Sequence, residues 1–173
     1  MDSLRKIVIT GPESTGKSWL TKKLGEHFQV PFADEYARYY LEEHGPDYDF
    51  ETLETIIQNH KTHQHQIISQ ATELVFLDTD LLNFKTWEQL VFGKTHDFLE
   101  KEIAKESDHL YLLTYPDIPW TPDPLRVNPD NRLELFELNL DLIKKLNRPY
   151  QIVRGGYDDR FKNALNRLNA LKI

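Results

Sequence analysis

The chain has 173 residues, a formal net charge of −7 and no cysteine. Its length predicts one domain, residues 1–173, with a substantial core, and the lack of cysteine excludes disulfides, thiolate metal ligands and a cysteine nucleophile. The negative charge argues against nucleic-acid partners, which need a basic surface, and no apolar run resembles a signal peptide or a membrane span. We therefore expect a cytoplasmic protein that acts on small molecules.

Short apolar runs alternate with helical patterns along the chain. This alternation predicts an α/β fold, with a parallel sheet of about five strands and helices on both faces. The expected strands are 5–10, 29–33, 73–78, 109–114 and 150–154. The expected helices are 17–28, 35–44, 51–71, 84–104, 131–147 and 158–172.

The first expected strand leads into GPESTGKS at 11–18, a complete G-x-x-x-x-G-K-[ST] phosphate-binding loop (P-loop, or Walker A motif). Its glycines let backbone N–H groups surround the phosphates, Lys17 reaches the β and γ oxygens, and the Ser18 hydroxyl can hold Mg²⁺. The helix that follows presents an N-terminus, which favours anions. The nucleotide is expected to contact Gly11, Glu13, Ser14, Thr15, Gly16, Lys17, Ser18 and Trp19.

A second motif, LVFLDTD at 74–80, has the pattern of a buried strand that ends in an acid. Ligands of open α/β sheets bind at the carboxyl ends of the strands, so Asp78 is predicted to be the Walker B acid and to bind Mg²⁺ together with Ser18. The alternative is that Asp78 caps the next helix. Thr79 occupies the position where hydrolytic motor ATPases commonly carry glutamate, and the guanine-reading motifs of GTPases are absent. The pattern therefore favours phosphoryl transfer to an organic hydroxyl.

Such a transfer needs a general base, arginines that neutralise the transferred phosphoryl group, and a lid that excludes water. Glu35 and Asp34 follow the second expected strand and are candidates for the base. Residues 116–129 hold five of the nine prolines, and we interpret 116–132 as a lid that supplies Arg126 and Arg132. A proline-rich surface loop without function is the alternative.

Three further segments, EYAR at 35–38, DTD at 78–80 and IPWTPDPLR at 118–126, follow the P-loop in an order that resembles a known family. The family is the NadR-type ribosylnicotinamide kinase domain, a stand-alone, AAA_28-like P-loop ATPase, and the resemblance extends over almost the whole chain. It implies a P-loop kinase fold and an activity of NAD biosynthesis, in which ATP and Mg²⁺ phosphorylate the 5′-hydroxyl of nicotinamide riboside to nicotinamide mononucleotide. One departure is Pro124, which stands where the NadR pattern has glycine.

The resemblance also implies roles for single residues. Residues 11–18 would hold the triphosphate, Asp78 would bind the metal, and Arg126 would belong to the lid. We predict Lys17, Glu35 and Arg126 to be the catalytic residues. The nucleoside would contact Glu35 and Asp80, and Trp120 and Asp123 would form the rim on the substrate side.

Nicotinamide riboside carries a pyridinium charge, so its pocket should pair acidic side chains with aromatic faces. Candidates for these contacts are Asp34, Glu35, Tyr36, Trp87 and Trp120. Tyr36 is equally consistent with core packing, and Arg38 either contacts phosphate or pairs with a neighbouring carboxylate. Two alternatives remain, namely a P-loop kinase for another nucleoside or a vitamin alcohol, and a non-catalytic ATP-binding regulatory module. The sequence does not fix the oligomeric state.

Two smaller patterns lie at the histidines of 60–65 and at the glycines of 155–156. His60, His63 and His65 are interpreted as a solvated helix face rather than a metal site, because helical spacing separates His65 from the other two. The backbone around Gly155 to Tyr157 either frames the adenine base or forms a tight turn with an aspartate cap.

Overall fold

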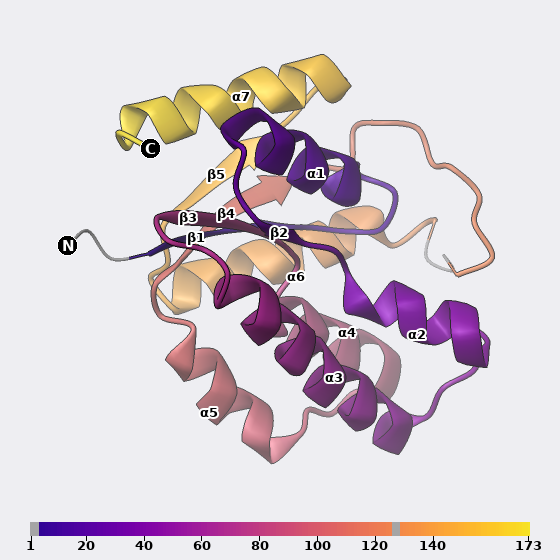
Figure 1. Cartoon of the computed structure of the whole chain (residues 1–173). Helices are drawn as coiled ribbons and strands as arrows, with labels where there is room; N and C mark the ends of the chain where they lie inside the picture. The colour runs from indigo at the N-terminus through magenta and orange to yellow at the C-terminus, as the bar shows by residue number, and fades with distance from the viewer. Residues whose placement is uncertain (1–3, 126–128) are drawn as a thin grey trace.

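A five-stranded parallel sheet lies at the centre of the protein (Figure 1). The computed structural model describes residues 4–125 and 129–173. The strands pair in the order β2-β3-β1-β4-β5, which confirms the predicted P-loop α/β class. Their bounds are β1 Arg5–Thr10, β2 Phe32–Ala33, β3 Leu74–Asp78, β4 His109–Thr114 and β5 Tyr150–Val153.

The expected strand 29–33 is reduced to the two residues of β2. The Val30 N–H bonds the Gly25 carbonyl at the end of the preceding helix, and Pro31 has no N–H to offer to a neighbouring strand. Pairing with β3 therefore begins only at Phe32.

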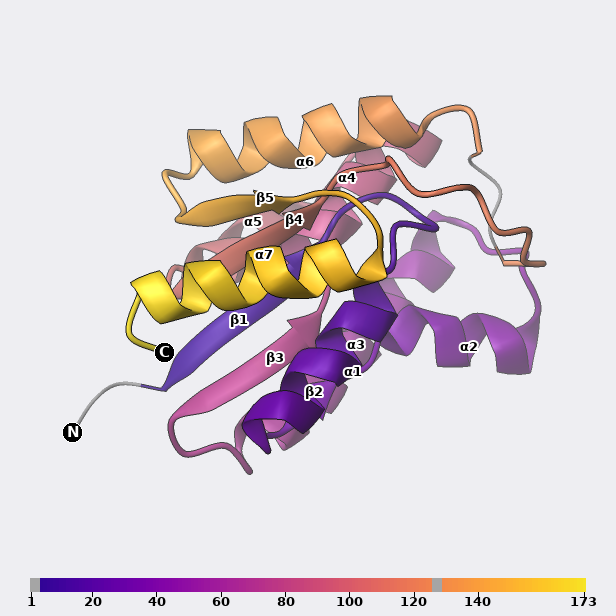
Figure 2. The same cartoon turned by 90° about the horizontal axis from the view of Figure 1, so that it is seen from above.

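Helices cover both faces of the sheet, as Figures 1 and 2 show. Helices α1 and α7 pack on one face, and the other face is covered mainly by α3, α4 and α6. Their bounds in the described residues are α1 Lys17–Phe28, α2 Tyr36–His44, α3 Phe50–Ile68, α4 Leu81–Phe92, α5 Asp97–Lys105, α6 Arg132–Lys145 and α7 Tyr157–Ala170. The single helix expected over 84–104 is wrong, because Gly93 adopts a left-handed φ of 64° and closes α4 through its N–H bond to the Gln89 carbonyl.

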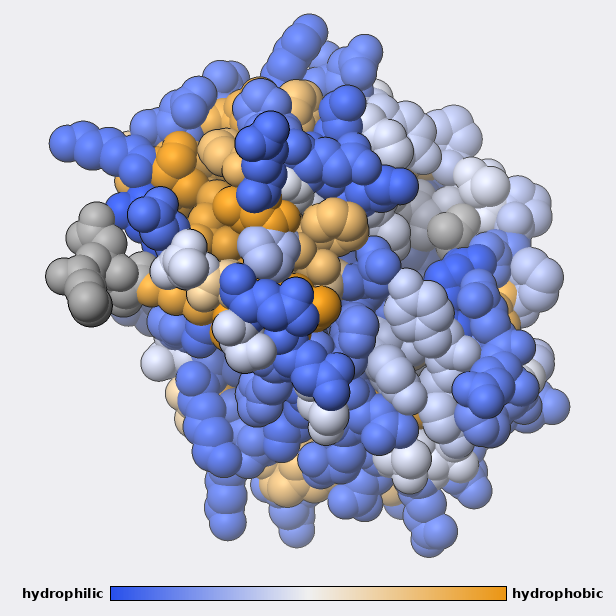
Figure 3. Space-filling model, viewed as in Figure 1, coloured by the Kyte–Doolittle hydropathy of each residue, from blue (hydrophilic) through white to orange (hydrophobic). Residues whose placement is uncertain are grey.

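Alternation along β1 divides the core between the two faces. Ile7 and Ile9 pack with α1 and α7, whereas Val8 packs in the larger cluster with α2 to α6. Figure 3 shows apolar side chains gathered over one part of the surface, at its upper left, and mostly polar residues elsewhere on that face. None of the helices in the described part of the chain is long and apolar enough to cross a membrane.

Helix α3 contains His60, His63 and His65, which the sequence predicts to form a solvated face. His60 is fully buried, and its ring packs edge-on against Phe84 at a centroid distance of 4.9 Å. His63 is half-buried, and only His65 is exposed. The interpretation is therefore wrong for His60, which faces α4. Burial lowers the pKa of His60 to about 4.

Candidate active site

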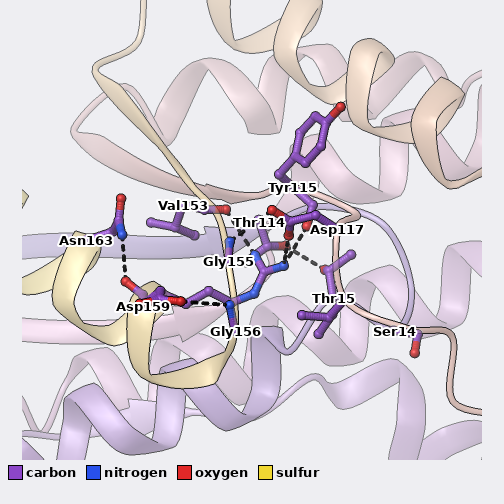
Figure 4. Close-up of polar contacts among 12 residues, drawn as sticks. Ser14, Thr15, Thr114, Tyr115, Asp117, Val153, Gly155, Gly156, Asp159 and Asn163 are labelled. Atoms are coloured by element: carbon purple, nitrogen blue, oxygen red, sulfur yellow. Dashed lines mark hydrogen bonds and ion pairs between the residues drawn. The ribbon is translucent and has the colours of Figure 1, made fainter.

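The P-loop connects the end of β1 to the start of α1 and depends on two glycines. Gly11 and Gly16 have φ angles of 137° and 79°, which residues with a Cβ rarely adopt. A Cβ on Gly11 would also lie 2.4 Å from Oγ1 of Thr114 at the end of β4. Oγ1 of Thr15 lies 2.6 Å from the same Thr114 atom (Figure 4). The phosphate loop is thus seated directly on β4.

Lys17, at the start of α1, is buried and donates from Nζ to the Pro12 carbonyl at 2.9 Å. Its ammonium group therefore remains inside the curve of the loop. The side chain can reach phosphate oxygens bound there by exchanging one carbonyl partner for another acceptor.

Asp78 ends β3 beside Ile9 of β1 and is fully buried. Neither of its carboxylate oxygens has a hydrogen-bond partner among the residues that the structure describes. Burial and the charge of Glu35 raise the pKa of Asp78 to about 7, against the opposing effects of Lys17 and the Ser18 hydroxyl. A buried carboxylate without partners, next to a hydroxyl on the P-loop, is the donor set that Mg²⁺ takes in P-loop proteins. These residues therefore fit the expected metal.

A cavity of about 320 Å³ opens from the P-loop toward α4 and α6. Its walls combine apolar side chains with a few polar ones, which is typical of small-molecule sites. Outside residues 11–19, the lining residues are Glu35, Ala37, Arg38, Leu41, Asn83, Thr86, Trp87, Leu90, Thr121, Leu125, Leu135, Asn139 and Tyr157.

The structure brings all eight predicted nucleotide residues to this cavity, together with three of the eight predicted substrate residues. Gly11, Glu13, Ser14, Thr15, Gly16, Lys17, Ser18 and Trp19 all line it. Glu35, Arg38 and Trp87 line it as well. Three residues predicted for the substrate, Glu35 among them, therefore share one space with the P-loop.

The predicted residues Asp34, Tyr36, Trp120 and Asp123 are not among the cavity-lining residues. Asp34 accepts a hydrogen bond from the Tyr39 hydroxyl at 2.8 Å, and Tyr36 packs against the large core cluster. Trp120 lies beneath the Arg132 guanidinium at 5.8 Å. Asp123 pairs with Arg38 at 2.9 Å, a contact that raises the pKa of Arg38. Arg126 lies outside the described residues.

Asp80, which the sequence predicts to contact the nucleoside, is also absent from the cavity lining. It is fully buried and caps α4 by accepting from the Leu82 N–H at 3.1 Å. Its other oxygen accepts from the Tyr111 hydroxyl at 2.5 Å and lies 2.9 Å from Nδ1 of His109. Both oxygens of Asp80 are therefore used inside the core, and Asp80 is not among the residues that line the cavity.

Sequence reasoning missed three polar residues that line the cavity. Asn83 and Thr86 lie four and one positions before Trp87 on α4, so helical spacing from Trp87 could have identified Asn83. Asn139 interrupts an apolar face of α6 and is buried. Oγ1 of Thr86 lies 3.4 Å from Oδ1 of Asn139. These side chains form a polar patch in a mostly apolar wall.

The described residues of the lid segment, 116–132, contact the P-loop. The Thr121 N–H donates to the Ser14 hydroxyl at 2.9 Å. Arg132 donates to the carbonyl oxygens of Ser14 at 3.1 Å and Ile118 at 3.0 Å. The pair between Arg38 and Asp123 ties the same segment to α2.

Comparison with known proteins gives a consistent result. The family model AAA_28, described as an AAA domain, matches residues 6–160. The trifunctional NAD biosynthesis/regulator proteins NadR of Escherichia coli (strain K12) and Salmonella typhimurium (strain LT2) are each 28% identical over 165 residues. Each match covers 91% of this chain and 40% of the relative. The chain therefore spans about two fifths of the length of the curated relatives it matches.

Solved structures share the fold. A NadR protein in complex with NR superposes with a TM-score of 0.83 at 23% identity, over 96% of this chain and 49% of that one. A NadR protein in complex with NAD and AMP-PNP gives 0.79 at 21% identity, with the same coverage. Thymidylate kinase from Ehrlichia chaffeensis gives 0.70 at 14% identity, over the full length of both chains. The fold is that of the P-loop kinases.

Proposed function

The chain belongs to the AAA_28 family of AAA domains, and from this premise we propose that it is an ATP- and Mg²⁺-dependent nicotinamide riboside kinase. In this proposal the chain acts as one kinase domain and transfers the γ-phosphoryl group of ATP to the 5′-hydroxyl of the nucleoside. The observation that carries the proposal is that the P-loop, Glu35 and the wall around Trp87 line one cavity. The relation to the NadR proteins adds support from an independent source.

On the donor side, the backbone of residues 11–18 would hold the triphosphate and Lys17 would neutralise the β and γ oxygens. Ser18 and Asp78 would hold Mg²⁺, which when bound offsets the charge that develops on the phosphates. A bound cation would also favour the ionised form of Asp78, whose pKa burial and Glu35 raise to about 7. Arg132, already bonded to the P-loop at Ser14, keeps the lid segment close to this side.

On the acceptor side, Glu35 would accept the proton of the 5′-hydroxyl as its oxygen bonds to the γ-phosphorus and the bond to the leaving ADP breaks. The Trp87 ring offers a face to the pyridinium cation. Asn83, Thr86 and Asn139 offer donors and acceptors to a carboxamide. This set suits an aromatic amide attached to a ribose better than it suits a purely apolar acceptor.

Two other functions remain as alternatives. The thymidylate kinase likeness is compatible with a P-loop kinase that phosphorylates another nucleoside or a vitamin alcohol. A non-catalytic module that binds ATP as a regulatory signal would need only the donor side. Asn83, Thr86, Trp87 and Asn139, which we call the acceptor wall, line the same cavity as the P-loop. Their presence there favours the kinase.

A panel of acceptors with Mg·ATP tests the proposal. ADP production and the mass of the product are measured with nicotinamide riboside, other nucleosides and vitamin alcohols, for the wild type and for Asp141→Asn, a control at an exposed position of α6. We expect both proteins to release ADP with nicotinamide riboside and to form its monophosphate. If ADP is released only with a different acceptor, that acceptor is the substrate and nicotinamide riboside is not. ATP binding without acceptor-dependent ADP release would favour the regulatory module.

A further inference from the structure

Arg160 lies where β4 and β5 separate. The two strands run side by side up to the pair Thr114 and Val153. Beyond it, Tyr115 leads into the lid segment and Arg154 leads into the turn before α7. The side chain of Arg160, from the first turn of α7, is fully buried at this point. The residues around it are drawn in Figure 4.

The guanidinium of Arg160 joins both strand ends. Nη1 donates to the Val153 carbonyl at 3.0 Å, and Nη2 donates to the Tyr115 carbonyl at 2.7 Å. The same Nη2 forms an ion pair with the Asp117 carboxylate. One side chain therefore links β4 and β5 at the point where their backbone hydrogen bonds end.

Asp117 extends this linkage to the turn of residues 154–157. Its Oδ2 accepts the Gly155 N–H at 2.9 Å, and Asp159 Oδ2 accepts the Gly156 N–H at 3.2 Å from the other side (Figure 4). Gly155 has a left-handed φ of 84°, and a Cβ there would lie 2.8 Å from Asp159. The turn is thus held from both sides in a conformation that suits glycine.

The turn places Tyr157 against the P-loop. A Cβ on Gly16 would lie 3.1 Å from Cε1 of Tyr157, and the Tyr157 ring meets Trp19 edge-on at 4.9 Å. Both rings line the cavity, yet 47% of Tyr157 and 36% of Trp19 are exposed. Exposed aromatic faces next to a phosphate loop suit the base of a bound nucleotide.

Burying Arg160 is costly, because desolvation lowers its pKa despite the partner Asp117. Buried ion pairs are often no better for stability than apolar side chains of similar volume. An apolar side chain could fill this space, but it could not supply directed bonds to Val153, Tyr115 and Asp117. The guanidinium therefore contributes more to the positions of Val153, Tyr115 and Asp117 than to the stability of the fold.

A second buried arginine provides a comparison. Arg148 precedes β5 at its opposite end and donates to the carbonyls of Ile103 and Glu106 at the end of α5. Its acceptors lie away from the P-loop and from the lid segment. Arg148 and Arg160 are therefore both buried and both donate to backbone carbonyls, but they connect different segments of the fold.

We propose that Arg160, acting with Asp117, is a positioning residue for the base of the nucleotide. It holds the turn 154–157 against the P-loop, so that Tyr157 and Trp19 meet the base while residues 11–18 hold the phosphates. The inference rests on the proposed function in one respect, that the phosphate donor is ATP.

Calorimetric titration with two probes tests this role: Mg·ATP, and Mg·tripolyphosphate, which has no base. The proteins are the wild type, Arg160→Met, Arg160→Lys, Asp117→Asn and the control Arg148→Met. We expect Arg160→Met to weaken ATP binding by about tenfold or more and to leave tripolyphosphate binding within about twofold, as the loss of a base contact predicts. Arg160→Lys should lose less ATP affinity than Arg160→Met. Lysine keeps the positive charge, but its ammonium group cannot replace the planar set of donors of a guanidinium. Arg148→Met should lower the denaturation midpoint and change neither affinity.

Equal losses for both probes in Arg160→Met would overturn the inference, because the effect would then lie in the phosphate loop or in the whole fold. Unchanged ATP binding would overturn it as well, and so would a wild type that binds ATP no more tightly than tripolyphosphate. If Arg160→Met does not fold, Asp117→Asn decides, because its side chain is 30% exposed and the change keeps its size. No acceptor or turnover is needed, so a failure of the kinase proposal with intact ATP binding is a distinct result.

Discussion

His60 on α3 is expected to make the protein less stable in mild acid. Burial, reinforced by the charge of His63 and opposed by that of Asp80, lowers the pKa of His60 from 6.5 to about 4. Below pH 6.5 the unfolded chain binds a proton that the native protein does not bind. The free energy of unfolding therefore falls as the pH decreases from 6.5 to about 4, and this contribution levels off at lower pH.

The magnitude follows from the two pKa values. At pH 4.5 the linkage relation gives a loss of about 2.5 kcal/mol relative to pH 7.5, at roughly 1.4 kcal/mol per pKa unit. His60→Leu removes the titrating group and keeps an apolar side chain against Phe84, which lies 4.9 Å from the His60 ring. We expect this variant to lose about 2.5 kcal/mol less than the wild type between the two pH values.

Urea denaturation at pH 7.5 and pH 4.5 measures this difference. His65→Leu is the matched control, because it makes the same substitution on the same helix at an exposed position. Other acidic groups titrate equally in all three proteins, so they cancel. If His60→Leu and His65→Leu showed the same dependence on pH as the wild type, the assignment of a buried neutral histidine would be refuted.

Four further variants test the site. Lys17→Ala should abolish phosphoryl transfer in a folded protein, because the charge on the β and γ oxygens grows in the transition state; near-normal turnover would remove the P-loop from the mechanism. Glu35→Gln should lower kcat about a hundredfold with ATP affinity intact if Glu35 is the base; a change confined to the acceptor KM would make it a binding residue. Arg126→Ala should lower kcat more than ATP affinity, by up to about a thousandfold for an arginine that acts on the transferred group; the reverse pattern would argue for a ground-state contact. Asp80→Asn should reduce the free energy of unfolding by about 2–4 kcal/mol, because one acceptor serves Tyr111 and His109 in the core; an unchanged denaturation curve with a raised acceptor KM would restore it to the substrate side.

The donor side could be predicted from the sequence because its geometry is local. Eight consecutive residues specify the P-loop, and their backbone conformation follows from Gly11, Gly16 and the start of α1. The proposed metal ligand required one more step, the recognition of a buried strand that ends in Asp78. Both predictions depend on spacing along the chain, which the sequence contains directly.

The role of Asp80 could not be predicted in this way. It follows Asp78 by two residues, which in an extended strand would place both side chains on one side. Thr79 instead adopts a left-handed φ of 67°, and the Gln64 side chain from α3 donates to its carbonyl at 2.8 Å. The chain turns at this residue, so Asp80 enters the core and caps α4. A non-glycine residue with positive φ is held by tertiary contacts and has no reliable signal in the sequence.

The acceptor wall shows the same limit over a longer distance. Thr86 and Asn139 are 53 residues apart in the chain and meet only because α4 packs against α6. Each is an ordinary polar residue in its own helix, and neither motif nor periodicity marks it as part of a site. The resemblance to the NadR-type domain depends on the P-loop, EYAR, DTD and lid motifs, and only Trp87 of this wall was identified from the sequence. In the proposed function, the reaction type would follow from local motifs. The identity of the acceptor would depend on how α4 and α6, from distant parts of the chain, pack together, which makes the acceptor panel the more informative experiment.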